Sequence, residues 1–106
     1  MQPSTDAIAA IVFDAVDDLN KQLPRNKRLD KSPGTRLAGP GGQLDSLGLV
    51  NLMVNTEQKL ETALGLEVML AEEAAGATDE QFATIGSFIA FVGGVAGKRR
   101  NVEADT

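Results

Sequence analysis

The sequence Gly42-Gln43-Leu44-Asp45-Ser46-Leu47-Gly48-Leu49-Val50 marks the point at which a glycine-rich loop gives way to a helix. Asp45 is a favourable N-cap, because a carboxylate accepts hydrogen bonds from the free N–H groups of a first helical turn. Leu47, Val50 and Val54 then follow at the spacing of one helical face. We therefore predict a helix that opens at Asp45-Ser46 and has Gly65 in the C′ position at its end.

This helix carries more apolar residues than one buried stripe needs. Its further apolar residues are Leu49, Leu52, Met53, Leu60 and Leu64. A helix that is apolar on several faces is either largely buried or exposes a docking surface. For Leu49, Leu52 and Met53 we expect roughly half of the excess to lie in the core and the rest to face partners or line a pocket.

The residues before this helix divide into a first helix and a long loop. A stripe of apolar residues predicts a helix over 6–23, which Pro24 ends. The stripe consists of Ile8, Val12, Ala15 and Leu19. Glycines and prolines predict a loop over 25–42, with Leu37 and Leu44 as the residues that pin it to the core.

The residues after Gly65 predict a loop, a short helix and a last helix. Leu66, Val68 and Leu70 are expected to tuck the loop onto the core, and 79–82 to form the short helix. The last helix is expected over 84–95, with 98–106 as a polar, disordered tail. The fold class is therefore all-α: a four-helix bundle of three longer helices and one short one, in a single domain over 1–106 with its folded core at 6–95.

The composition excludes several classes of function. The chain has no His and no Cys, which rules out Ser-His-Asp and Cys-His catalysis, structural zinc sites and disulfides. We predict no catalytic residue and no metal site. No apolar run reaches the roughly 18 residues that a membrane span needs. The first residues also lack a signal-peptide pattern, so we expect a cytoplasmic protein.

The charge is distributed unevenly along the chain. The net charge is −5, and residues 42–92 hold eight acids against one base. This acidic half argues against nucleic-acid binding and favours protein partners with basic docking patches. By contrast, 21–36 holds six bases against one acid, and its simplest interpretation is a solvated segment.

Ser46 is the candidate site residue. No histidine base can activate it as an enzyme's own nucleophile, whereas a helix start beside an open loop suits modification by another enzyme. A phosphodiester attached there would lie near the positive end of the helix dipole. The simpler interpretation, a serine that helps to cap the helix, is weaker in this setting.

Asp45-Ser46-Leu47 resembles the Asp-Ser-Leu attachment motif of acyl carrier proteins. Glu57 stands where carrier helices usually have a Glu, and 82–89 resembles the family's entry into its last helix. The resemblance covers roughly 7–95. It departs from carriers of fatty acid synthesis at Gly48 and Asn51, where those proteins often have acids. This departure indicates a carrier dedicated to a specialised pathway.

The resemblance implies that a phosphopantetheinyl transferase attaches 4′-phosphopantetheine from coenzyme A to Ser46. The arm would hold acyl groups as thioesters for acyl-activating, synthase or acyltransferase enzymes that dock on the second helix, in fatty-acid, lipid or specialised-metabolite synthesis. Asp45 is also a candidate contact for the transferase. The carrier itself would be a monomer that catalyses nothing. The alternatives are an aminoacyl, D-alanyl or peptidyl carrier, and an unmodified helical adaptor; an esterase is disfavoured by the missing His.

Overall fold

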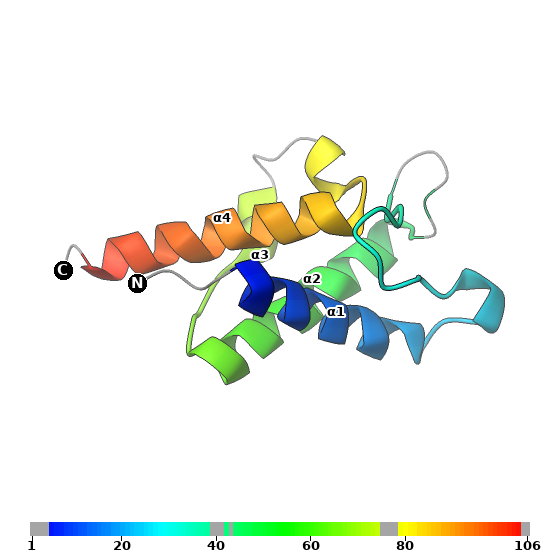
Figure 1. Cartoon of the computed structure of the whole chain (residues 1–106), viewed down its shortest axis with the longest axis horizontal. Helices are drawn as coiled ribbons and strands as arrows, with labels where there is room; N and C mark the ends of the chain where they lie inside the picture. Colours follow the sequence, from blue (N-terminus) through cyan, green and yellow to red (C-terminus); the bar gives the residue numbers. More distant parts are fainter. Residues whose placement is uncertain (1–4, 39–41, 43, 75–78, 105–106) are drawn as a thin grey trace.

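Three long helices form the body of the protein, shown in Figure 1 as a computed structural model. The structure describes residues 5–38, 42, 44–74 and 79–104, and their side chains apart from those of Ser46, Asp79 and 98–104. The long helices are α1 (Thr5–Asn20), α2 (Ser46–Leu64) and α4 (Ile85–Ala104). Among the described residues there is no strand, only an isolated antiparallel bridge between Arg36 and Thr84. The prediction of an all-α bundle with three longer helices is confirmed.

Helix α1 supplies one wall of the core. The predicted apolar stripe is buried, and its buried residues are Ile8, Ile11, Val12, Ala15, Val16 and Leu19. The helix ends at Asn20, before the expected Leu23. The reason is that the Asn20 side chain turns to the backbone of Leu29 and ties the following segment to the helix end. Pro24 then precedes a short 3-10 helix, η1 (Arg25–Lys27).

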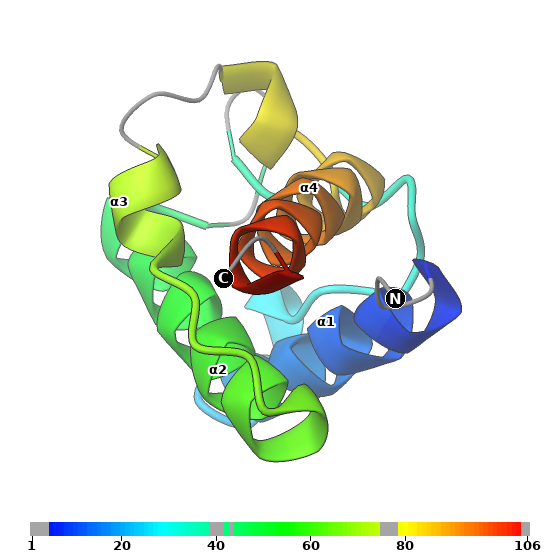
Figure 2. The same ribbon diagram turned by 90° about the vertical axis from the view of Figure 1, so that its left-hand side faces the viewer.

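The core lies between the three long helices. Helix α1 packs against both α2 and α4, and the short helix α3 (Leu70–Ala74) lies against α2 and α4 (Figure 2). Leu52, Leu60 and Phe88 are fully buried at the centre. Phe82 and Phe91 meet edge to face with ring centroids 5.1 Å apart, a favoured aromatic geometry.

Glycine ends α2 as predicted. Gly65 has φ 68° and ψ 21°, the left-handed conformation, and its N–H donates to the carbonyls of Leu60 and Glu61. In the segment that follows, Leu66, Val68 and Leu70 are buried, so the prediction of a loop tucked onto the core is confirmed.

The short helix predicted at 79–82 is present as a 3-10 helix, and a second short helix precedes it. The short α-helix is α3, whereas 79–82 forms a 3-10 helix, η2 (Asp79–Phe82). The sequence pattern does not separate α3 from the loop before it. The buried residue of α3, Leu70, also belongs to the alternating run of Leu66, Val68 and Leu70.

The start of α4 is fixed by its own cap and by the long loop. Thr84 and Ser87 exchange hydrogen bonds between side chains and backbone N–H groups, in the manner of a capping box. The carbonyls of Pro33 and Thr35 accept hydrogen bonds from the N–H groups of Gly86 (2.8 Å) and Ile85 (2.9 Å). We call residues 33–37, which run across this helix start, the strap.

The end of α4 lies at Ala104, so the expected end at Val95 is wrong. Val95 and Ala96 are buried, and this packing offsets the cost of about 1 kcal/mol that each glycine imposes on a helix. Residues 98–104, expected in the tail, are helical in backbone, and 105–106 lie outside the described residues. None of the helices in the described part combines the length and apolarity that a membrane crossing requires.

Candidate functional site

The loop before Ser46 reaches the start of α2 along a defined path. The N–H of Leu44 donates to the carbonyl of Leu37 (2.9 Å), and the N–H of Leu37 donates to the carbonyl of Ala83 (2.8 Å). Leu37 and Leu44 are both buried, so the prediction that they pin the loop is confirmed. A Cβ at Gly42 would lie 2.7 Å from the carbonyl carbon of Ala38, so this tight approach requires a glycine.

Asp45 caps α2 as predicted, and Ser46 is the first residue of the helix. Asp45 has extended backbone angles, and its Oδ1 accepts a hydrogen bond of 2.8 Å from the N–H of Gly48. Its backbone carbonyl accepts the N–H of Leu49 at 3.0 Å. The backbone of Ser46 thus lies at the N-terminus of a 19-residue helix, where the dipole favours an attached anion. The Ser46 side chain, and with it the predicted accessibility of its hydroxyl, lies outside the described residues.

An exposed apolar stripe continues from Ser46 along α2. It consists of Leu47, Val50 and Val54, with 67%, 43% and 40% of their surface exposed. Met69, just before α3, is 59% exposed. We call Leu47, Val50 and Val54 the α2 stripe. Exposed apolar residues at helical spacing on one element are typical of a surface that partners cover.

The widened apolar surface of α2 belongs mostly to the core. Leu52 and Met53 are buried, and Leu49 is half-buried and packs against the core. Thr56 is also buried, and its hydroxyl donates to the carbonyl of Leu52 at 2.8 Å. The apolar residues of α2 that remain exposed are therefore those of the α2 stripe rather than Leu49, Leu52 and Met53.

The acids of α2 have different surroundings. Glu57 is half-buried, and its Oε2 accepts a hydrogen bond of 2.6 Å from the N–H of Leu70 at the start of α3. Glu61 is exposed one turn further along. Glu57 therefore holds α3 in place, a role that the sequence pattern does not reveal. Of the two, only Glu61 is exposed.

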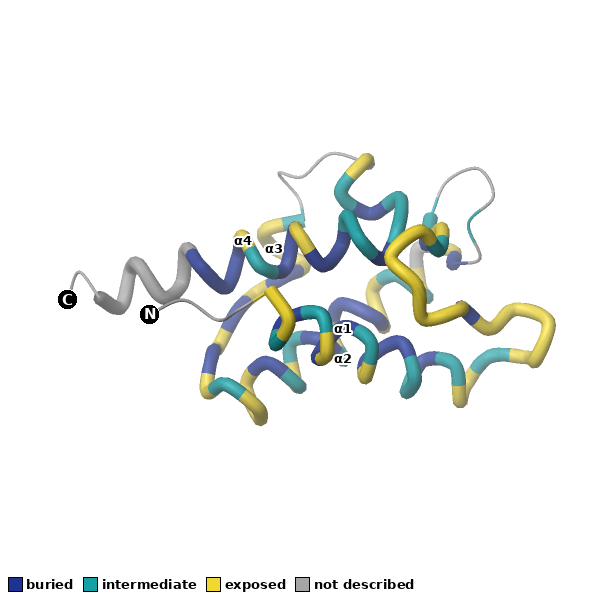
Figure 3. The backbone as a smooth tube through the Cα atoms, viewed as in Figure 1, coloured by how far each residue is buried: buried dark blue, intermediate teal, exposed yellow. Residues whose placement is uncertain are grey.

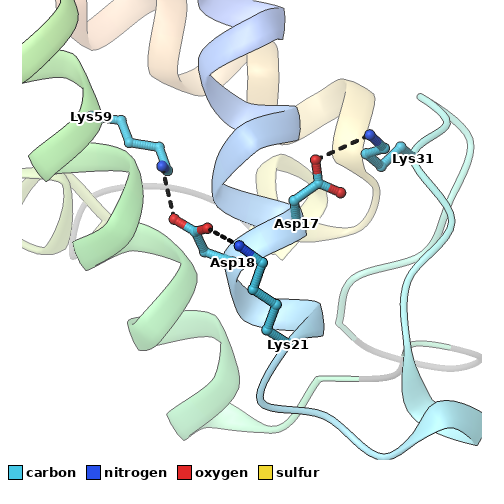
Figure 4. A network of polar contacts seen from close by, with 5 residues as sticks. All are labelled: Asp17, Asp18, Lys21, Lys31 and Lys59. Carbon is cyan, nitrogen blue, oxygen red and sulfur yellow. Dashed lines mark hydrogen bonds and ion pairs between the residues drawn. The ribbon is translucent and has the colours of Figure 1, made fainter.

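Ion pairs join α1 to α2 and to the basic segment that follows α1 (Figure 4). Lys59 on α2 reaches Asp18 on α1 at 2.8 Å, and Lys21 lies 3.5 Å from the same carboxylate. The hydrogen bond from Lys59 is the main reason why the pKa of Asp18 is lowered. The same bond raises the pKa of Lys59.

Among the described residues no cluster of three acids is arranged to hold a metal ion. The site thus consists of the loop that leads to Ser46, the Asp45 cap and the α2 stripe. It combines a helix N-terminus, which favours an anion, with an exposed apolar stripe. We compared the chain with protein-family models, curated proteins and solved structures, and none matched, so no relative supplies a function for it.

Proposed function

We propose that this chain is an acyl carrier protein whose Ser46 bears a 4′-phosphopantetheine arm. The observation that carries the proposal is the position of Ser46 as the first residue of α2, directly after the Asp45 cap and directly before the α2 stripe. A serine in this place can be offered to a transferase while the stripe provides an apolar contact for it.

The covalent step joins the oxygen of Ser46 to the phosphate that bears the pantetheine arm of coenzyme A. The adenosine bisphosphate part of coenzyme A leaves, and the serine proton passes to the transferase. The attached phosphodiester carries a negative charge, which the N-terminus of α2 stabilises. The thiol at the end of the arm then holds acyl groups as thioesters. Because the arm is tethered, it presents them to docked enzymes at high effective concentration.

Incubation of the apo chain with coenzyme A and a broad-specificity phosphopantetheinyl transferase tests this function. Mass spectrometry is expected to show a gain of one phosphopantetheine. Ser46→Ala abolishes the gain, whereas Ser32→Ala, at an exposed serine of the long loop, retains it. A chain that several transferases leave unmodified would instead be an unmodified helical adaptor.

The contact with the α2 stripe is tested separately. Leu47→Asn is expected to raise the KM of the transferase for the carrier without lowering the midpoint of thermal unfolding, because Leu47 is 67% exposed. Thr62→Asn, at an exposed position near the other end of α2, is the control.

The cargo distinguishes the fatty-acyl carrier from its close alternatives. Aminoacyl, D-alanyl and peptidyl carriers would use the same serine and the same arm. The thioester found on the protein purified from its host separates these possibilities. Gly48 and the exposed Asn51, at positions where acids are usual, favour partners other than those of general fatty acid synthesis.

A further inference from the structure

The basic segment 21–36 is fixed to the end of α1. The side-chain amide of Asn20 donates to the carbonyl of Leu29 and accepts its N–H, both at 2.8 Å. The Leu29 side chain is only 4% exposed. Two residues further on, Lys31 bonds to Asp17 at 3.1 Å (Figure 4). These contacts fix both ends of residues 21–28, so the cations between them stay near the end of α1, which lowers the entropy cost of binding them.

Three cations of this segment face outward. We call Arg25, Lys27 and Arg28 the η1 face; all three are exposed. The segment that follows α1 is largely yellow, the colour of exposed residues, in Figure 3. The nearby carboxylates of Asp17 and Asp18 are already paired with lysines. No ion pair joins the η1 face to any described acid, and Arg28 makes only a long contact of 3.4 Å, from its Nε to the Leu23 carbonyl. These charges are therefore available to an external anion.

A hollow of about 410 Å³ opens beside the η1 face. It is lined by Asp17, Asn20, Lys21 and Arg28. Asp17 and Asn20 are occupied by the contacts that fix the segment, whereas the guanidinium of Arg28 offers several free N–H donors. An entering carboxylate would meet Arg28 in the paired geometry that guanidinium groups form with carboxylates.

We propose that the η1 face docks an acidic segment of a partner protein, with one carboxylate side chain entering the hollow beside Arg28. Nucleic acids and anionic membranes fit less well. They bind through many cations, whereas this face has three and the whole chain carries a net charge of −5. Screening limits the attraction to roughly 10 Å, so a compact acidic patch matches the face best. This surface uses neither Ser46 nor the α2 stripe, so it goes beyond the carrier function.

Titration of the isotope-labelled full chain with a synthetic polyglutamate peptide, followed through backbone amide shifts, tests the proposal. The shifts are expected to concentrate at residues 20–31 and to weaken with added salt. The triple variant Arg25→Gln/Lys27→Gln/Arg28→Gln is expected to bind the peptide about tenfold more weakly, the sum of three exposed charge contacts. Its amide spectrum elsewhere is expected to remain that of the parent, since the contact that Arg28 makes within the loop is long, at 3.4 Å.

The triple variant Lys98→Gln/Arg99→Gln/Arg100→Gln is the matched control, because it removes the same charge from the end of α4. It is expected to bind the peptide as the parent does. Equal losses in both triple variants, or shifts spread over the molecule, would show non-specific attraction and overturn the proposal. Tighter binding of a single-stranded oligonucleotide or of phosphatidylserine vesicles through residues 20–31 would overturn it as well. The Ser46→Ala chain is expected to bind the peptide unchanged, which keeps this test separate from that of the carrier function.

Discussion

The carboxylate of Glu57 on α2 accepts a hydrogen bond of 2.6 Å from the backbone N–H of Leu70, the first residue of α3. This bond satisfies one of the free donors at the start of a helix too short to be stable alone. It links two elements that are separated by the left-handed turn at Gly65.

Removal of this bond is expected to loosen α3. Glu57→Ala leaves the N–H of Leu70 without its partner and lowers the free energy of unfolding by about 1–3 kcal/mol. Glu57→Gln keeps an acceptor oxygen, so its free energy of unfolding should fall by less. Urea unfolding measures both, with Glu61→Ala as the exposed control on the same helix. Equal stabilities of Glu57→Ala and Glu61→Ala would show that the bond does not stabilise the fold.

A second prediction concerns the clamp between Asn20 and Leu29. Asn20→Ala removes an acceptor and a donor from the half-buried backbone of Leu29, at an expected cost of about 1–3 kcal/mol. The Leu29 amide should then exchange with solvent much faster, as measured by hydrogen exchange. Gln22→Ala, at an exposed position two residues on, serves as the control. Unchanged protection of Leu29 in Asn20→Ala would contradict the assignment.

The ion pair of Asp18 and Lys59 predicts a pH dependence of stability. The pKa of Asp18 is lowered by folding, so its contribution is present above the ordinary value of 3.8 and is lost as the pH falls through the lower folded value. The pKa of Lys59 is raised, so its contribution is present below 10.5 and is lost as the pH rises through the folded value. The free energy of unfolding of Lys59→Met should therefore differ from that of the parent at neutral pH and become equal to it in strong acid. Denaturant unfolding across the pH range measures this difference, which stays small because Asp18 is well exposed. A difference that persists in strong acid would have another origin than this pair.

A fourth prediction rests on the carrier function. Asn51 is exposed on α2, and Asn51→Glu supplies an acid where carriers of fatty acid synthesis often have one. With a broad-specificity transferase that docks through basic residues, we expect modification of Ser46 to become about two- to tenfold faster at low salt. Added salt should remove the gain. Asn51→Gln is the control of similar size, and an equal gain in that variant would exclude an electrostatic cause.

The parts of the fold that local patterns specify could be predicted from the sequence. The stripe of α1, the Asp45 cap and the Gly65 turn each depend on residues within a few positions of one another. Leu37 and Leu44 could be predicted as anchors, because a large apolar side chain in a polar loop is most stable when it is buried against the core.

The contacts that fix the site's surroundings could not be predicted in the same way. Asn20 with Leu29 and Glu57 with Leu70 join a side chain to a backbone group nine and thirteen residues away, and no periodic pattern marks such a pair. The end of α4 was missed because burial of Val95 and Ala96 outweighs the low helix propensity of the glycines around them. The basic segment 21–36 is largely exposed, in line with its interpretation as a solvated segment, but its anchors, Leu29 and Lys31, have no local signal in the sequence.

The strap across the start of α4 affects where proteases can cut the native chain. Pro33 and Thr35 bind the N–H groups of the first turn of α4, so this part of the loop unfolds together with the helix. Arg36 is exposed, yet its backbone is held in the bridge to Thr84 and cannot enter a protease cleft without that opening. Arg25 and Lys27 have no such restraint beyond one turn of 3-10 helix. Brief trypsin treatment of the native protein should therefore cut around η1 and spare the bond after Arg36, leaving two fragments that remain associated through the core.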